Sequence, residues 1–278
     1  STSAKDFMMP EESVWVTLTV AGNLARSFGD TVPKVTTGTK EPPRFVIQGL
    51  TNSIVYLFTS EGECATIPVH QLPQVEEPSD GATFNGLCSL PASSQIAAML
   101  CLPAGLENGY LFLTSEGGQV KRIRLTDLPG LSANVFRVMN VNGSDRVGWV
   151  FPTDGQQEII LTSDQAQAIR FKESEVRPTG LPAGGMRGIK LLGQGGRVVG
   201  ANIAVPGRYV WNITDDGVAK VSAVDDYPTQ GRAGGGVISM RLPNSSRGVA
   251  AATIGKLDDN VIVLSNRNKP LYMRIGRA

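Results

Sequence analysis

Tyr110-Leu-Phe-Leu-Thr-Ser-Glu-Gly117 is the stretch of sequence that decides the fold. Its apolar run is rich in residues that suit a pleated, half-buried surface, and it ends in Thr-Ser before a glycine that can adopt a positive φ. A second run containing Lys121-Arg-Ile-Arg124 follows. Two short runs around a tight turn are typical of a β-hairpin, so this stretch predicts one.

The same hairpin signature recurs along the whole chain. The residues before the turns stand at positions 19, 59, 114, 162, 214 and 264. Their spacing of about 50 residues is the range of blade-type repeats. The six copies are Val14–Gly22, Ile54–Gly62, Tyr110–Gly117, Glu158–Gln165, Tyr209–Gly217 and Asn260–Asn268. Because Gln165 stands where the other copies have Gly or Asn, we expect a different turn in the fourth hairpin.

Further strand-like runs lie between the hairpins. They are Gly188–Leu192 and Arg197–Val205 after the fourth hairpin, and Val237–Leu242 and Gly248–Ile254 after the fifth. Two hairpin strands and two further strands make a four-stranded sheet, which buries both faces only when several such sheets stack around an axis. No 12-residue window shows an amphipathic helical stripe. The sequence therefore predicts an all-β, propeller-like fold in a single domain over residues 1–278.

Composition excludes several classes of function. The formal net charge is only +1, so any surface for a polyanion must come from local clusters of Lys and Arg. The single histidine, His70, argues against a metal site or a Ser-His-Asp triad. The odd number of cysteines (Cys64, Cys88 and Cys101) indicates reduced thiols in a cytosolic protein. No run approaches the length of a membrane span. We expect no metal, no cofactor and no catalysis within this chain.

Two stretches carry a resemblance to a known family. Arg177-Pro-Thr-Gly-Leu-Pro-Ala-Gly-Gly-Met-Arg-Gly-Ile-Lys-Leu-Leu192 is followed by Val198-Val-Gly-Ala201, and Asp226-Tyr-Pro-Thr-Gln-Gly-Arg-Ala-Gly-Gly-Gly-Val237 repeats the pattern. Together they resemble the C-terminal domain of the DNA gyrase A-type chain and its topoisomerase IV counterpart. The resemblance implies a β-pinwheel of five or six four-stranded blades whose basic rim binds and bends duplex DNA.

The resemblance also implies partners and a location. These are double-stranded DNA, the remainder of the A-type chain, the ATPase B-type chain, and the cytoplasm close to the nucleoid. The DNA-cleaving tyrosine of such an ATP-dependent topoisomerase would lie outside this chain. The A-type chains of gyrase carry a box close to Q-R-R-G-G-R-G after the first hairpin, and this chain has no such box between Phe28 and Arg44. We therefore expect DNA bending with little chiral wrapping. The sequence does not decide whether the enzyme that contains this chain is a gyrase or a topoisomerase IV.

Basic residues in the second hairpin strands and in the loops are the candidate DNA contacts. Alternation along a strand places Lys121 opposite to Arg122 and Arg124. The second hairpin has no cation over Glu63–Pro68, so we expect a poor DNA surface there. The other reading of these cations is a solvated strand face, and the other function is a protein-interaction propeller. The predicted contacts are Arg26, Lys121, Arg122, Arg124, Arg170, Lys172, Arg177, Arg187, Lys190, Lys220, Arg232 and Arg274.

Overall fold

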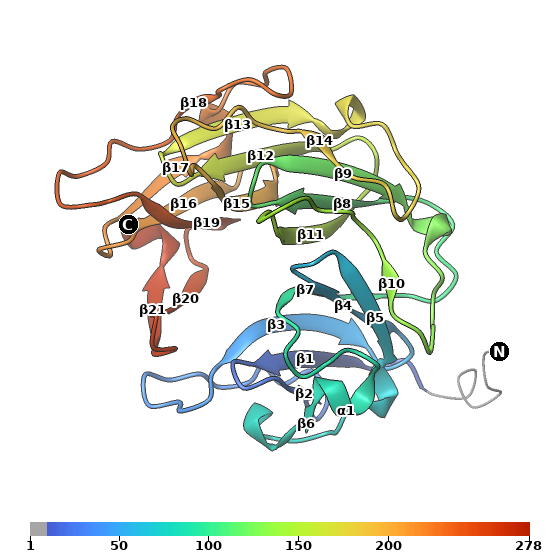
Figure 1. The fold of residues 1–278 in the computed structure, drawn as a ribbon. Helices are drawn as coiled ribbons and strands as arrows, with labels where there is room; N and C mark the ends of the chain where they lie inside the picture. The colour runs from blue at the N-terminus through green and yellow to red at the C-terminus, as the bar shows by residue number, and fades with distance from the viewer. Residues whose placement is uncertain (1–9) are drawn as a thin grey trace. The chain divides into compact units, whose positions relative to one another are not determined.

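The computed structural model describes residues 10–278, and these residues form an all-β fold. They contain the strands β1 to β21, short 3-10 turns and one four-residue helix, α1 (Phe84–Leu87) (Figure 1). The predicted fold class is therefore confirmed at the level of secondary structure. Among the described residues, no helix is long and apolar enough to cross a membrane.

The strands form six antiparallel sheets, each built on one of the predicted hairpins. The first sheet has the order β3-β1-β2-β6, with β1 Ser13–Thr19, β2 Asn23–Arg26, β3 Pro43–Leu50 and β6 Ala82–Thr83. The second has the order β10-β5-β4-β7, with β4 Ile54–Thr59, β5 Glu63–Pro68, β7 Ile96–Leu102 and β10 Phe136–Arg137. The third has the order β11-β8-β9-β14, with β8 Tyr110–Ser115, β9 Gln119–Arg124, β11 Val147–Thr153 and β14 Met186–Arg187.

The remaining sheets continue the series with fewer strands toward the end of the chain. The fourth has the order β15-β12-β13-β18, with β12 Glu158–Ser163, β13 Gln167–Lys172, β15 Val198–Ile203 and β18 Val237–Ile238. The fifth has the order β17-β16-β19, with β16 Tyr209–Thr214, β17 Ala219–Ala223 and β19 Val249–Gly255. The sixth pairs β20 (Asn260–Leu264) with β21 (Pro270–Arg274). Within residues 10–278, four strands per sheet therefore hold for the first four sheets only.

A hydroxyl residue fixes each hairpin turn. Its side-chain oxygen accepts the backbone N–H of the residue four positions on, at 2.9–3.2 Å. This local side-chain cap stabilises the tight turn. The six residues are Thr19, Thr59, Ser115, Ser163, Thr214 and Ser265. The positions 114, 162 and 264 that the sequence pattern predicted are therefore one residue early.

The fourth hairpin has the same turn as the others, so the expectation drawn from Gln165 is wrong. In every turn the residue three positions after the hydroxyl residue has a positive φ, and it is glycine in four of them and Asn268 in the sixth. In the fourth it is Ala166, with a φ of 60°. The N–H of Ala166 binds the carbonyl oxygen of Ser163 at 3.1 Å, as the N–H of Gly118 binds that of Ser115 at 3.0 Å. The hydrogen bonds of the repeat thus hold an alanine in a strained conformation.

The outer strand of each four-stranded sheet comes from the following repeat. β6, β10, β14 and β18 all follow the next hairpin in the sequence, yet each pairs with the second strand of the hairpin before it. The prediction that consecutive strands make one sheet is therefore wrong. A long strand over Gly188–Leu192 is also absent from the described chain, because β14 ends at Arg187 and the N–H of Lys190 binds the carbonyl oxygen of Gly234 instead of β9.

The described residues gather into two compact units. Unit 1 holds the first and second sheets, in residues up to 107 and 128–138, and unit 2 holds the third to fifth sheets, in residues 108–127 and 139–261. The sixth hairpin is divided between them. Each unit has its own buried apolar clusters, and strands such as β4 are buried at every position because other layers cover both faces. A single domain over residues 1–278 stays a prediction.

Candidate nucleic-acid interface

Three of the predicted arginines bind backbone carbonyl oxygens of the next repeat. Each lies on the second hairpin strand, and its guanidinium donates to the carbonyl of the residue that follows the next 3-10 turn. The pairs are Arg26 Nε to Leu72 at 3.1 Å, Arg122 Nε to Val176 at 2.5 Å and Arg170 Nη1 to Tyr227 at 3.3 Å. A backbone bridge accompanies each pair. The recurring arginine that the sequence presented as a DNA contact therefore joins one repeat to the next.

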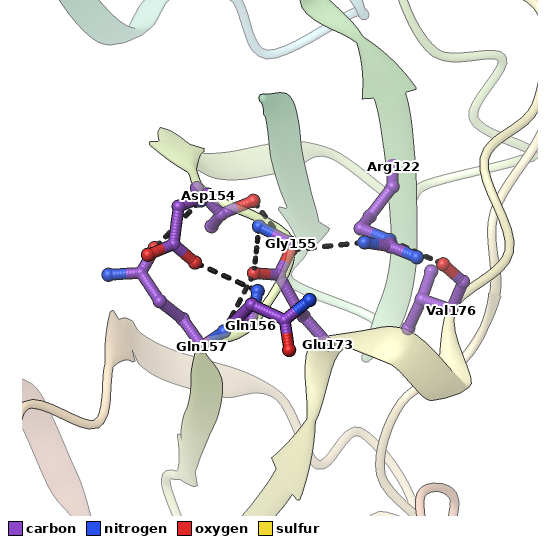
Figure 2. A network of polar contacts seen from close by, with 8 residues as sticks. Arg122, Asp154, Gly155, Gln156, Gln157, Glu173 and Val176 are labelled. Carbon is purple, nitrogen blue, oxygen red and sulfur yellow. Dashed lines mark hydrogen bonds and ion pairs between the residues drawn. The ribbon is translucent and has the colours of Figure 1, made fainter. Parts of the chain in front are cut away.

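Arg122 also belongs to a buried ion pair in unit 2. Its Nη1 lies 3.2 Å from the carboxylate of Glu173, whose side chain is fully buried, and its guanidinium stacks 4.1 Å from the ring centre of Tyr110. Figure 2 shows the Arg122 side chain reaching both Glu173 and Val176. Burying two charges is costly unless the remaining hydrogen-bonding capacity is used. The Glu173 carboxylate uses it by accepting bonds from the Thr153 hydroxyl and from the backbone N–H groups of Gly155 and Gln157.

The position of Glu173 is apolar in the second, third, fifth and sixth repeats. It is the first residue of the 3-10 turn after the hairpin, where the equivalent residues are Val69, Leu125, Val224 and Ile275. All four of these side chains are buried. The carboxylate therefore replaces an apolar core residue, and it serves packing between the third and fourth sheets.

Lys121 is buried as well, on the opposite face of β9. Only 1% of the residue is exposed, and its Nζ donates to the carbonyl oxygens of Leu181 and Ala183 at 2.5 and 2.8 Å. Burial lowers the pKa of the Lys121 amine to about 8, because desolvation penalises the charged form. Lys121 and Arg122 are therefore too deeply buried in this conformation to contact a phosphate.

Arg170 and Arg26 are also held within the protein. Arg170 forms a 2.5 Å ion pair with Glu158, and 13% of its side chain is exposed. Arg26 is half-buried beside a hollow of about 330 Å³, which the loop over Phe28–Lys34 forms with Val75–Pro78. In the same loop region Glu41 accepts hydrogen bonds from Thr19 and Asn23. This acidic partner and the acidic pair at 76–77 make the first loop a poor anion site.

The other predicted cations lie at the surface of unit 2. Arg124, Lys172, Arg177, Arg187, Lys190, Lys220 and Arg274 are exposed, and Arg232 is half-buried. Two contacts bring three members of this set together. The Arg232 guanidinium donates to the carbonyl oxygen of Arg187. In the loop that contains Arg232, the carbonyl oxygen of Gly234 accepts the N–H of Lys190. The carboxylate of Glu175 lies beside this cluster of Arg187, Lys190 and Arg232, since it accepts the N–H of Arg232 at 3.2 Å.

Sequence reasoning missed a second set of exposed cations. Arg146, Arg197 and Arg247 stand one or two residues before the third strands β11, β15 and β19 and are exposed. Arg241 occupies the place after β18 that Lys190 occupies after β14. The signal was present in the sequence, because an arginine precedes Val147, Val198 and the Gly-Val pair at 248–249. It becomes visible only when the repeats are aligned on their third strands.

Each of the first four sheets is built from a hairpin, a third strand and an outer strand supplied by the following repeat, and loops of the repeats carry exposed cations. These features are those of an all-β, propeller-like repeat protein. Comparison with known proteins then gives the family. The family model "DNA gyrase C-terminal domain, beta-propeller" matches residues 109–135, 157–204 and 213–265. The chain belongs to the DNA gyrase C-terminal domain family, which confirms the resemblance seen in the sequence.

Relatives and solved structures agree with this assignment. The chain is 27% identical to the DNA gyrase A protein of Dehalogenimonas lykanthroporepellens over 97% of its length, and 30% identical to that of Escherichia coli over 81%. It spans 34% and 26% of these two relatives. The crystal structure of the C-terminal domain of DNA topoisomerase IV has a TM-score of 0.81, with 22% identity over 97% of this chain and 85% of that one. A gyrase A C-terminal domain has a TM-score of 0.73, with 20% identity over 96% and 90%. These structures share the fold.

Proposed function

We propose that this chain binds duplex DNA without reading its sequence and bends it, as a non-catalytic part of the A-type chain of a bacterial type IIA topoisomerase. The observation that carries the proposal is the concentration of exposed cations on unit 2, centred on Arg187 and Lys190 beside the half-buried Arg232. Guanidinium and ammonium groups at the surface neutralise phosphates and release counterions, and this does not depend on base sequence. The partners would be double-stranded DNA, the rest of the A-type chain and the ATPase B-type chain, in the cytoplasm at the nucleoid.

Bending follows from spreading the cations over several sheets. Bending a 20–30 bp duplex by 40–90° costs on the order of 1–6 kcal/mol, which contacts distributed along the bent path must repay. The catalytic tyrosine and the ATP-dependent steps would belong to the rest of the enzyme. Chiral wrapping would be small, because the loop over residues 28–44 lacks the basic box, and the charges of Asp30 and Glu41 partly offset those of its three cations.

The test is the salt dependence of binding to random-sequence duplexes. We expect the logarithm of the binding constant to fall linearly with the logarithm of salt concentration, with a slope of about −0.9 for each phosphate contacted. Fluorescence transfer between the duplex ends should rise on binding. A protein-interaction propeller would show neither effect, and that result would refute the proposal.

A second experiment tests wrapping separately from binding. A nicked plasmid religated with the domain bound should show little positive change in linking number, although the duplex is bent. A strong positive change for each bound domain would show that another loop replaces the missing box, and the Gly-rich loop over residues 230–236 is the candidate.

A further inference from the structure

One backbone hydrogen bond recurs where the third strand of a sheet begins. The N–H of the residue after the hairpin's hydroxyl position binds the carbonyl oxygen of the residue just before the third strand, at 2.7–3.0 Å. The pairs are Val20 with Pro42, Ser60 with Gln95, Glu116 with Arg146, Asp164 with Arg197 and Asp215 with Gly248. The bond places a residue of each repeat at the same point beside the hairpin turn. We call these five acceptors the strand-entry positions.

In unit 2 a carboxylate holds the backbone of an arginine at or next to the strand-entry position. Asp164 Oδ1 accepts the N–H of Arg197 at 3.0 Å, and Asp215 Oδ1 accepts the N–H of Arg247 at 2.9 Å. In the third sheet the N–H of Arg146 is held at 2.7 Å by its neighbour Asp145. The side chains of all three arginines are exposed. The backbone is thus fixed from the turn while the guanidinium group lies at the surface.

Unit 1 has no equivalent arrangement among its described residues. Its strand-entry residues are Pro42, which has no N–H, and Gln95. The segment over residues 82–95, which leads to the second of them, contains no lysine or arginine. The corresponding segments of unit 2 run over residues 186–197 and 237–248. The first carries Arg187, Lys190 and Arg197, and the second carries Arg241 and Arg247.

We propose that Arg197 and Arg247, with Arg146 as a third member, contact DNA phosphates, and that Asp164 and Asp215 are positioning residues that hold the first two in place. The proposal rests on the proposed function and adds to it a row of contacts that repeats from sheet to sheet. Arginine presents a planar fork that matches a phosphate group. A fixed backbone lowers the conformational entropy lost on binding, so each pinned guanidinium binds more tightly than one on a mobile loop.

Two matched variants test the row. Arg197→Gln with Arg247→Gln should lower the magnitude of the salt slope by about 2, since each lost phosphate contact removes about 0.9. Lys34→Gln with Lys40→Gln removes the same charge from unit 1 and should leave the slope unchanged. An unchanged slope in the first variant, or an equal fall in both, overturns the row while leaving DNA binding itself intact. Absence of salt-dependent binding in the unaltered protein overturns the proposed function and the row together.

The positioning role is tested at Asp164. Asp164→Asn and Asp164→Ala both remove a negative charge, but only Asn keeps an oxygen that accepts the Arg197 N–H. We expect the Asn variant to bind duplex DNA at least as tightly as the unaltered protein, and the Ala variant to bind about 2–10-fold more weakly than the Asn variant, which is the cost of ordering one side chain. Both variants should have the same secondary structure by circular dichroism. Equal affinities for the Asn and Ala variants would overturn the positioning role.

Discussion

Unit 1 and unit 2 use the same repeat backbone but carry different charges. Both have hydroxyl-capped hairpins, exchanged outer strands and the same backbone bond at the strand-entry position. Acidic residues outnumber basic ones in the sequence of unit 1, whereas basic residues outnumber acidic ones in unit 2. The exposed cations at the strand-entry positions follow this division.

The fold and the surface charge thus depend on different positions of the repeat. Buried apolar residues, the hydroxyl cap and one positive-φ residue hold each hairpin, and these are shared by both units. The strand-entry residue contributes to this bond only its backbone carbonyl oxygen. Residues with side chains as different as Pro42, Gln95 and Arg197 therefore make the same bond. A chain of this kind keeps one fold throughout while the charge at its surface differs from sheet to sheet.

The largest effect is expected at the buried ion pair, which occurs in unit 2 among the described residues. Arg122→Met leaves the Glu173 carboxylate buried without its cation and should lower the free energy of unfolding by about 3–5 kcal/mol. The double variant Arg122→Met with Glu173→Leu restores the apolar residue found in four other repeats and should recover most of the loss. Urea unfolding followed by tryptophan fluorescence measures both. A single variant as stable as the unaltered protein would show that the pair is dispensable.

A smaller effect is expected from the pKa of Lys121. Its pKa of about 8 in the folded protein lies below the ordinary value of 10.5, so the unfolded chain holds more protons between these pH values. The free energy of unfolding should therefore rise with pH through this window. Lys121→Met should lack this rise, because it does not titrate. The check is to measure the difference in free energy of unfolding between the two proteins at about pH 7.5 and again at about pH 10. Most of the expected change falls between these two pH values. A difference that does not change with pH would contradict the prediction.

The smallest effect is expected at a hairpin turn. Gly217 has a φ of +91° and nothing within 4 Å of an added Cβ, so Gly217→Ala introduces strain without a clash. We expect a loss of about 1–2 kcal/mol in the free energy of unfolding, comparable to the strain that Ala166 already bears in the fourth hairpin. Thermal or urea unfolding gives the value. A gain in stability would show that these turns do not require the left-handed conformation.

Much of the fold could be predicted from the sequence, because hairpin runs are local. Alternating apolar residues and turn residues report directly on neighbours in the chain, and all six hairpins were identified. The exchanged outer strands β14 and β18 are only two residues long and pair across a whole repeat, so no local pattern marks them.

The candidate site was harder to predict for the same reason. The sequence of a strand does not show whether a charged side chain faces solvent or binds a carbonyl oxygen of the next repeat. Lys121 and Arg122 bind carbonyl oxygens of the next repeat. Arg197 and Arg247 lie in loops with no regular pattern, and only the backbone bond that fixes them reveals that they are equivalent.

Amide hydrogen exchange with and without a random-sequence duplex of about 30 bp tests most directly whether unit 2 carries the DNA interface. Segments that lead from the outer strand to the strand-entry position are equivalent across the repeats, so they form an internal comparison. We predict slower exchange on DNA binding over residues 186–197 and 237–248, and unchanged exchange over residues 82–95 and 28–44. Protection over residues 82–95 or 28–44, with none over the unit 2 segments, would contradict the account.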